Sequence, residues 1–101
     1  MFLKELTELS GVSGCEYEVR NYIKNKLSET GCEYYTDKLG NVIAHNKGKK
    51  NKTIMVAAHM DEVGLIVSHI DSEGFIKFQT VGGIDQRVLN SKAVLVGENK
   101  I

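Results

Sequence analysis

The sequence predicts an α/β fold, in which two helices lead into a mixed sheet and a β-rich segment follows. Apolar residues recur at helical spacing in residues 1–31, a continuous apolar run covers residues 54–58, and short apolar runs bounded by glycine continue from Gly64. Beyond that point strands no longer alternate with helices. This change indicates a domain boundary, which we place between residues 69 and 70.

The first third of the chain predicts two helices. Apolar side chains recur at helical spacing over residues 2–9, and Gly11 is a natural stop. The second helix follows a capping-box pattern, Ser13-Gly14-Cys15-Glu16, in which the serine accepts from the amide three residues on while the glutamate bonds back to the serine amide. Its apolar positions repeat every four residues up to Gly31, which can adopt the left-handed conformation that ends a helix.

The remaining elements are predicted to be strands. Residues 33–37 and 41–45 form short strands around a turn, and residues 46–52, with four lysines, form a solvated loop. The continuous apolar run at 54–58 is typical of a central strand covered on both faces. Residues 64–70 and 75–80 predict a hairpin around Asp71-Ser72-Glu73-Gly74, and the segment Val88 to Val96 is expected to form more strand with turns.

The composition limits which kinds of partner and which cellular compartment can be expected for this protein. Thirteen basic and thirteen acidic residues leave no net field that would attract nucleic acid or an anionic membrane. The first ten residues do not have the pattern of a secretory signal, and the longest apolar run is too short to cross a bilayer. Cys15 and Cys32 are too few for a disulfide framework. These features predict a cytoplasmic protein that binds neither membranes nor nucleic acid.

One short segment carries residues suited to metal chemistry. His59 directly follows the apolar run, and Asp61 lies two residues further on, where an extended chain places both side chains on one face. A metal-binding histidine usually donates its other N–H to a carboxylate or carbonyl, which fixes the tautomer. Ligands of open α/β sheets also gather at the carboxyl ends of strands. The pair alone is nevertheless weak support, because a histidine at a strand end is often structural.

A longer series of motifs supports the metal-site interpretation. In order, the motifs are Ser13-Gly14 with Glu16, Val19-Arg20, Asp37-Lys38-Leu39-Gly40-Asn41-Val42, Ala58-His59-Met60-Asp61-Glu62-Val63-Gly64 and Val81-Gly82-Gly83. They resemble the successive N-terminal motifs of the tetrahedral aminopeptidases, a family that includes glutamyl aminopeptidases and proteins labelled CelM-type endoglucanases. The resemblance covers nearly the whole chain.

The resemblance implies that residues 1–69 are the N-terminal part of a two-metal aminopeptidase catalytic domain, and that residues 70–101 begin an inserted β-rich assembly domain. It also implies two divalent metal ions, zinc or cobalt, that activate a water for attack on an N-terminal peptide bond. Peptide substrates and a homo-oligomeric complete enzyme follow from the same resemblance. His59 matches the first metal ligand of the family, and Asp61 matches the catalytic-site aspartate beside it.

The remaining ligands and the general base of that family have no counterpart in this sequence. A catalytic zinc needs about three protein ligands, and neither His45 nor His69 has a spacing that suggests ligation. We therefore expect this chain alone to be inactive and to bind at most one metal ion weakly. Glu62 points to the opposite face from Asp61, which argues against Glu62 as a general base.

The sequence leaves two other functions open. The chain could be a stand-alone metal-binding or interaction module, in which these residues serve folding only. It could also be an endoglucanase, as the second family label suggests. Glycoside hydrolysis requires two carboxylates that face one cleft, a condition that Asp61 and Glu62 do not meet on an extended strand.

Overall fold

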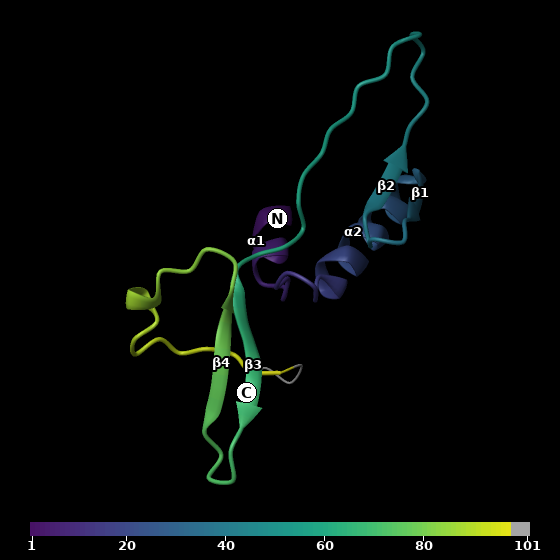
Figure 1. Cartoon of the computed structure of the whole chain (residues 1–101). Helices are drawn as coiled ribbons and strands as arrows, with labels where there is room; N and C mark the ends of the chain where they lie inside the picture. The colour runs from purple at the N-terminus through teal and green to yellow at the C-terminus, as the bar shows by residue number, and fades with distance from the viewer. Residues whose placement is uncertain (98–101) are drawn as a thin grey trace. The chain divides into compact units, whose positions relative to one another are not determined.

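The computed structural model describes residues 1–97, and Figure 1 shows the order of their elements. The chain divides into two compact units, Met1–Glu62 and the residues from Val63 onward. The first unit contains α1 (Phe2–Thr7), α2 (Tyr17–Thr30), β1 (Glu33–Thr36) and β2 (Val42–His45), and the second contains β3 (Gly64–Ile70), β4 (Ile76–Val81) and the 3-10 helix η1 (Gln86–Val88). The α/β prediction is confirmed in outline.

The predicted mixed sheet does not form within residues 1–97. Both sheets there are two-stranded and antiparallel, one made of β1 and β2 and the other of β3 and β4. Each consists of neighbouring strands joined by a short turn, so the pairing is local. The division into domains at residues 69 and 70 concerns the complete protein and stays a prediction.

The helix α2 ends as predicted but begins later. Its C-terminal Gly31 has a φ of 70°, the left-handed conformation that favours glycine. At the other end the cap is Glu16, without a side-chain capping bond, and the helix starts at Tyr17. Glu16 accepts from the Gly14 amide at 2.6 Å, while the Ser13 hydroxyl donates to Asp61 instead of serving the helix. The capping-box prediction was wrong because a residue far along the chain engages the serine.

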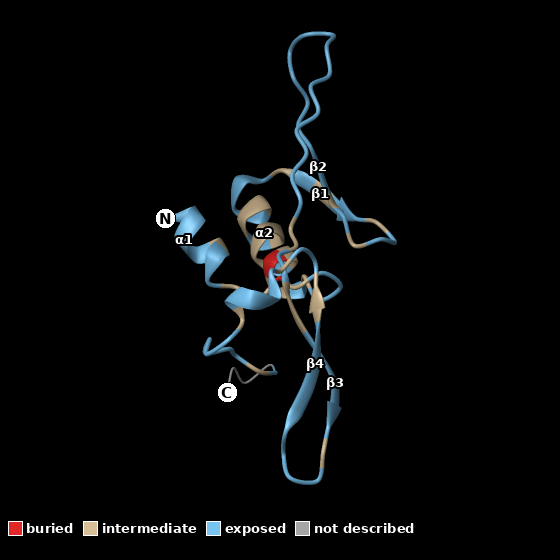
Figure 2. Cartoon of the chain, turned by 60° about the vertical axis from the view of Figure 1, so that its left-hand side comes forward, coloured by how far each residue is buried: buried red, intermediate tan, exposed pale blue. Residues whose placement is uncertain are grey.

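The core of the first unit is small. Val19 on α2 is the only hydrophobic side chain that is buried among residues 1–97. Figure 2 shows in red how small the buried region is. Gly11 lies against it, because a Cβ there would be 3.1 Å from Val19 Cγ2 and 3.2 Å from the Met60 carbonyl oxygen. A side chain at position 11 would therefore crowd both α2 and the segment around His59, and glycine lets the backbone approach them without any shift.

The hairpin of β1 and β2 is attached to α2 through Arg20. The Arg20 Nε donates to the Gly40 carbonyl oxygen at 2.8 Å, and Gly40 itself has a φ of 90°. The Asp37 carboxylate accepts from the Leu39 and Asn41 amides at 2.9 and 2.8 Å and so closes the turn. The hydrogen bond from the Asn41 side chain is the largest cause of the lowered pKa of Asp37, and the bonds from the Asn41 and Leu39 amides add to it.

Gly40→Ala is expected to lower the free energy of unfolding of the first unit by about 1–2 kcal/mol from the left-handed backbone alone. Crowding adds to this cost, since the new Cβ would lie 2.7 Å from Arg20 Nη2. Urea unfolding followed by tyrosine fluorescence measures this effect, because all four tyrosines lie in residues 1–62. Gly48→Ala is the matched control: no atom lies within 4 Å of its added Cβ. Equal effects of the two substitutions would contradict the assignment.

The predicted central strand at residues 54–58 is not formed. Residues 53–60 have no ladder partner among residues 1–97, and Ile54, Met55 and Val56 are 87–90% exposed. A strand of this kind needs hydrogen-bonded neighbours on both sides and helices over both faces. The described part of the chain supplies neither, so an apolar segment typical of a sheet interior stands in solvent.

The second unit consists of the β3–β4 hairpin and the segment that follows it. Gly64 pairs with Val81 and Ile70 with Ile76, with an irregularity between Val67 and His69, so the predicted hairpin is confirmed. The prediction of more strand in Val88 to Val96 was wrong. Asp85 accepts from the Arg87 amide at 3.0 Å and caps η1, and residues 89–97 contain no strand. A side chain that bonds its own backbone two residues on favours a turn over a strand.

Candidate metal-binding site

The segment that carries His59 and Asp61 is held in place by a short parallel contact with residues 11–13. The Glu62 amide donates to the Gly11 carbonyl at 2.7 Å, and the Ser13 amide donates to the Glu62 carbonyl at 3.3 Å. The Glu62 side chain adds a third bond, since its Oε1 accepts from the Gly11 amide at 3.2 Å. These bonds fix the backbone at Glu62, directly after Asp61, although the residues before His59 have no strand partner among residues 1–97.

His59 and Asp61 lie on the same side of the chain, as the sequence predicts. The His59 Nδ1 is 3.1 Å from Asp61 Oδ1 and 3.0 Å from the Asp61 carbonyl oxygen. Because both neighbours are acceptors, the neutral ring must carry its proton on Nδ1. The Nε2 lone pair then faces outward on a side chain that is 85% exposed. This tautomer and orientation are those of an imidazole that can bind a metal.

Asp61 accepts a second hydrogen bond, from the Ser13 hydroxyl to its other oxygen, Oδ2. This bond, with a smaller contribution from His59, lowers the pKa of the Asp61 carboxyl. The order of the three groups is Ser13, Asp61, His59. In a serine hydrolase the hydroxyl must bond the imidazole, which takes its proton. Here the carboxylate stands between them, so the arrangement orients a histidine and does not activate a serine nucleophile.

A hollow of about 180 Å³ lies beside the imidazole. Its lining residues are Glu16, Arg20, Leu39, Gly40, Asn41, Ala58, His59, Met60 and Asp61. Glu16 and Arg20 form a half-buried ion pair within it, with Arg20 Nη2 3.3 Å from Glu16 Oε2. The Gly14 amide is the largest cause of the lowered pKa of Glu16. The hollow therefore contains one cation and two carboxylates that stay ionised.

The described residues contain no complete set of metal ligands. No group of three or more His, Cys, Asp or Glu side chains within residues 1–97 could hold a metal ion. His45 lies in β2 opposite Glu33, and His69 lies in β3 opposite Lys77. The His59–Asp61 pair fits a single imidazole ligand with its orienting carboxylate, whereas a pair of ions needs further groups to bridge and hold them.

Two features of this site were not predicted. Ser13 was assigned to a helix cap, yet its hydroxyl bonds Asp61 across 48 residues. The alternation argues only against Glu62 as a general base, whereas in the structure the Glu62 side chain accepts a hydrogen bond from the Gly11 amide. The sequence contains no periodic signal for the contact between residues 11–13 and 62, because an isolated parallel bridge leaves no alternating pattern.

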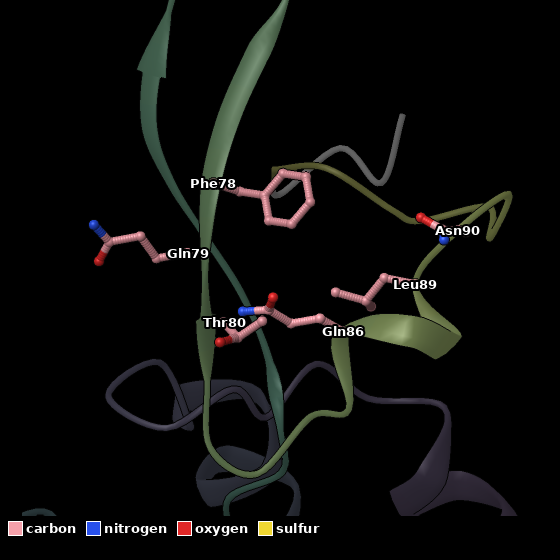
Figure 3. A pocket seen from close by; sticks show the side chains of 6 residues that line it. All are labelled: Phe78, Gln79, Thr80, Gln86, Leu89 and Asn90. Atoms are coloured by element: carbon pink, nitrogen blue, oxygen red, sulfur yellow. The ribbon is translucent and has the colours of Figure 1, made fainter.

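A second, larger hollow of about 570 Å³ belongs to the other unit and is formed by β4, η1 and the residues that follow η1 (Figure 3). Its lining residues are Phe78, Gln79, Thr80, Gln86, Leu89 and Asn90. Figure 3 shows Phe78 and Thr80 on the side of β4 that faces Gln86 and Leu89. The lining has amides, a hydroxyl and two apolar side chains but no titratable group, so it offers no acid, base or metal ligand.

Comparisons with known proteins find two family models that match this chain. The family described as M42 glutamyl aminopeptidase matches residues 40–101, which include His59 and Asp61, and a second family, described as AMPT, matches residues 1–21. The described residues thus form a small α/β fold, and most of the sequence matches a peptidase family. The chain belongs to the M42 glutamyl aminopeptidase family.

Individual relatives carry two kinds of description. The lysyl aminopeptidase of Pyrococcus furiosus is 46% identical over 83 residues, which are 81% of this chain and 24% of that protein. The glutamyl aminopeptidase of Lactococcus lactis is 38% identical over 92 residues, 89% of this chain and 26% of that protein. A crystal structure from Thermotoga maritima described as an endoglucanase has a TM-score of 0.90 at 47% identity and covers 97% of this chain and 32% of its own.

The chain therefore spans about a quarter of the length of the curated relatives that it matches. The likeness to the Thermotoga protein supports the α/β fold of this chain and extends over about a third of that protein's chain.

Proposed function

We propose that this chain is the N-terminal part of the catalytic domain of a metal-dependent aminopeptidase, in which His59 is a metal ligand and Asp61 orients it. The observation that carries the proposal is the His59 ring, bonded through Nδ1 to Asp61 and open at Nε2, in a chain of the M42 family. In the complete enzyme two divalent ions, zinc or cobalt, would polarise the peptide carbonyl and supply an activated water.

Within that enzyme the present residues bind and orient. His59 offers Nε2, Asp61 keeps the proton on Nδ1, and residues 11–13 fix the backbone at Glu62, directly after Asp61. The other ligands and the general base come from outside this chain. The chain alone therefore lacks turnover, because one imidazole cannot hold a co-catalytic pair.

The proposed partners follow from the same assignment. The substrates are peptides with a free N-terminus, and the complete enzyme is a homo-oligomer in the cytoplasm whose β-rich assembly domain begins within residues 70–101. The described helices include none that is both long and apolar enough to span a membrane. Neither nucleic acid nor a membrane surface is a proposed partner, since the basic and acidic residues balance.

A chimera tests the proposal. The matching segment of the Pyrococcus furiosus lysyl aminopeptidase is replaced by that of this chain, and the release of p-nitroaniline from lysyl p-nitroanilide is measured. The chimera is expected to hydrolyse the substrate, to lose activity with a chelator and to regain it with zinc or cobalt. The isolated 101-residue chain, assayed with the same metals, is expected to show no turnover above background. A folded chimera without activity would refute the assignment.

The description of the Thermotoga relative makes an endoglucanase the second candidate. Glu16 and Asp61 do line one hollow, as a glycosidase pair would. A glycosidase, however, needs one carboxylic acid whose pKa is raised so that it can protonate the leaving group. The pKa values of Glu16 and Asp61 are both lowered. We therefore favour the peptidase, and release of reducing sugar from carboxymethylcellulose by the chimera would reverse this preference.

A further inference from the structure

We infer that Ser13 is a positioning residue for the metal ligand: its hydroxyl holds the Asp61 carboxylate, which in turn keeps the His59 proton on Nδ1 and the Nε2 lone pair free. The inference rests on the proposed function, because it assigns a purpose to the orientation of His59. It extends that function to a residue from the loop between α1 and α2, outside the segment that carries the ligand.

The position of the serine hydroxyl is set by the backbone. Val12 and Glu62 form a parallel bridge, and the Ser13 amide donates to the Glu62 carbonyl oxygen at 3.3 Å. Two more hydrogen bonds join Gly11 and Glu62. The Glu62 amide donates to the Gly11 carbonyl oxygen, and the Gly11 amide donates to the Glu62 side chain. Ser13 is therefore fixed next to Asp61 by bonds that do not involve its own side chain, and a substitution of the hydroxyl leaves these bonds in place.

The carboxylate needs such a partner because little else restrains it. The Asp61 side chain is 43% exposed, and the residues before His59 are unpaired. With Oδ2 held by Ser13, Oδ1 is left 3.1 Å from His59 Nδ1. Without the hydroxyl the carboxylate can rotate, and the Asp61 carbonyl oxygen remains as the single fixed acceptor for the imidazole N–H. The proton on the ring would then redistribute toward Nε2 and block the coordinating lone pair.

The tautomer of His59 tests this inference in the 101-residue chain without any metal. Long-range 1H–15N spectra of the neutral, 15N-histidine-labelled chain report the ratio of Nδ1–H to Nε2–H. We expect Nδ1–H to predominate in the unmodified chain. Ser13→Ala should lower the ratio by about 3- to 10-fold, the effect of one hydrogen bond. Ser13→Thr keeps the hydroxyl and should retain the original ratio. Ser28→Ala is the matched control, since its hydroxyl bonds elsewhere in the same unit.

The outcomes separate this inference from the proposed function. An unchanged ratio in Ser13→Ala, with Nδ1–H still dominant, would refute the role of Ser13 and leave the ligand assignment intact. A dominant Nε2–H in the unmodified chain would refute both. If Ser13→Ala unfolds the chain, Ser13→Cys is measured in its place, because a thiol is similar in size to the hydroxyl but a weaker hydrogen-bond donor. The inference expects Ser13→Cys to lower the ratio of Nδ1–H to Nε2–H. A ratio equal to that of the unmodified chain would overturn it.

Discussion

His59→Ala in the lysyl aminopeptidase chimera is expected to lower kcat/KM by more than about 100-fold, since loss of a ligand's hydrogen-bonding partner alone costs about 10- to 100-fold. The substitution removes the open imidazole nitrogen that the structure presents beside Asp61. Progress curves with lysyl p-nitroanilide at saturating zinc measure the effect. The reason for so large a loss is that the remaining ligands cannot fill the vacated coordination position.

The other two histidines are the matched controls for this prediction. His45→Ala alters a β2 residue and His69→Ala a β3 residue, and neither belongs to a group that could hold a metal among residues 1–97. Both should change kcat/KM by less than about twofold, which lies within the usual range for surface substitutions. A loss for His45→Ala or His69→Ala as large as that for His59→Ala would show that the assignment of the ligand is wrong.

Val56→Asp is expected to leave the stability of the isolated chain nearly unchanged but to destabilise the chimera. Val56 is 90% exposed in the isolated chain, so its free energy of unfolding should change by less than about 0.5 kcal/mol. In the chimera the apolar run should lie within the sheet that the sequence predicts, and an unpaired buried charge there should cost at least about 3 kcal/mol. Soluble yield and thermal unfolding of both proteins measure the difference.

Lys50→Asp provides the control for Val56→Asp, because it introduces the same carboxylate in the exposed loop before the run. It should have little effect in either protein. Similar, small effects of Val56→Asp in both proteins would mean that residues 54–58 are not a covered strand of the complete domain, and that the sequence pattern was misinterpreted.

Local elements of this fold were predictable from the sequence, whereas long-range contacts were not. Gly31 ended α2 and Asp71-Ser72-Glu73-Gly74 joined two strands as expected, because helix stops and hairpin turns depend on residues close together in the chain. The start of α2 was misplaced because Ser13 bonds Asp61, 48 residues away.

The strand predicted at residues 54–58 shows the opposite error. Its composition is typical of an interior segment, but burial requires neighbours, and residues 1–97 supply none for it. The pairing of His59 with Asp61 was predictable, since alternation along an extended chain requires only two residues of local geometry. The Ser13 contact needed coordinates, because it depends on how the loop before α2 meets the segment after His59.

We propose that the Nε2 atom of His59 is the group that binds metal. Titration of the 15N-histidine-labelled chain with zinc tests it most directly, because one spectrum resolves both ring nitrogens of all three histidines. We predict a change centred on His59 Nε2, with micromolar or weaker affinity, that disappears in His59→Ala. A change at His59 Nδ1, or a larger one at His45 or His69, would contradict the claim.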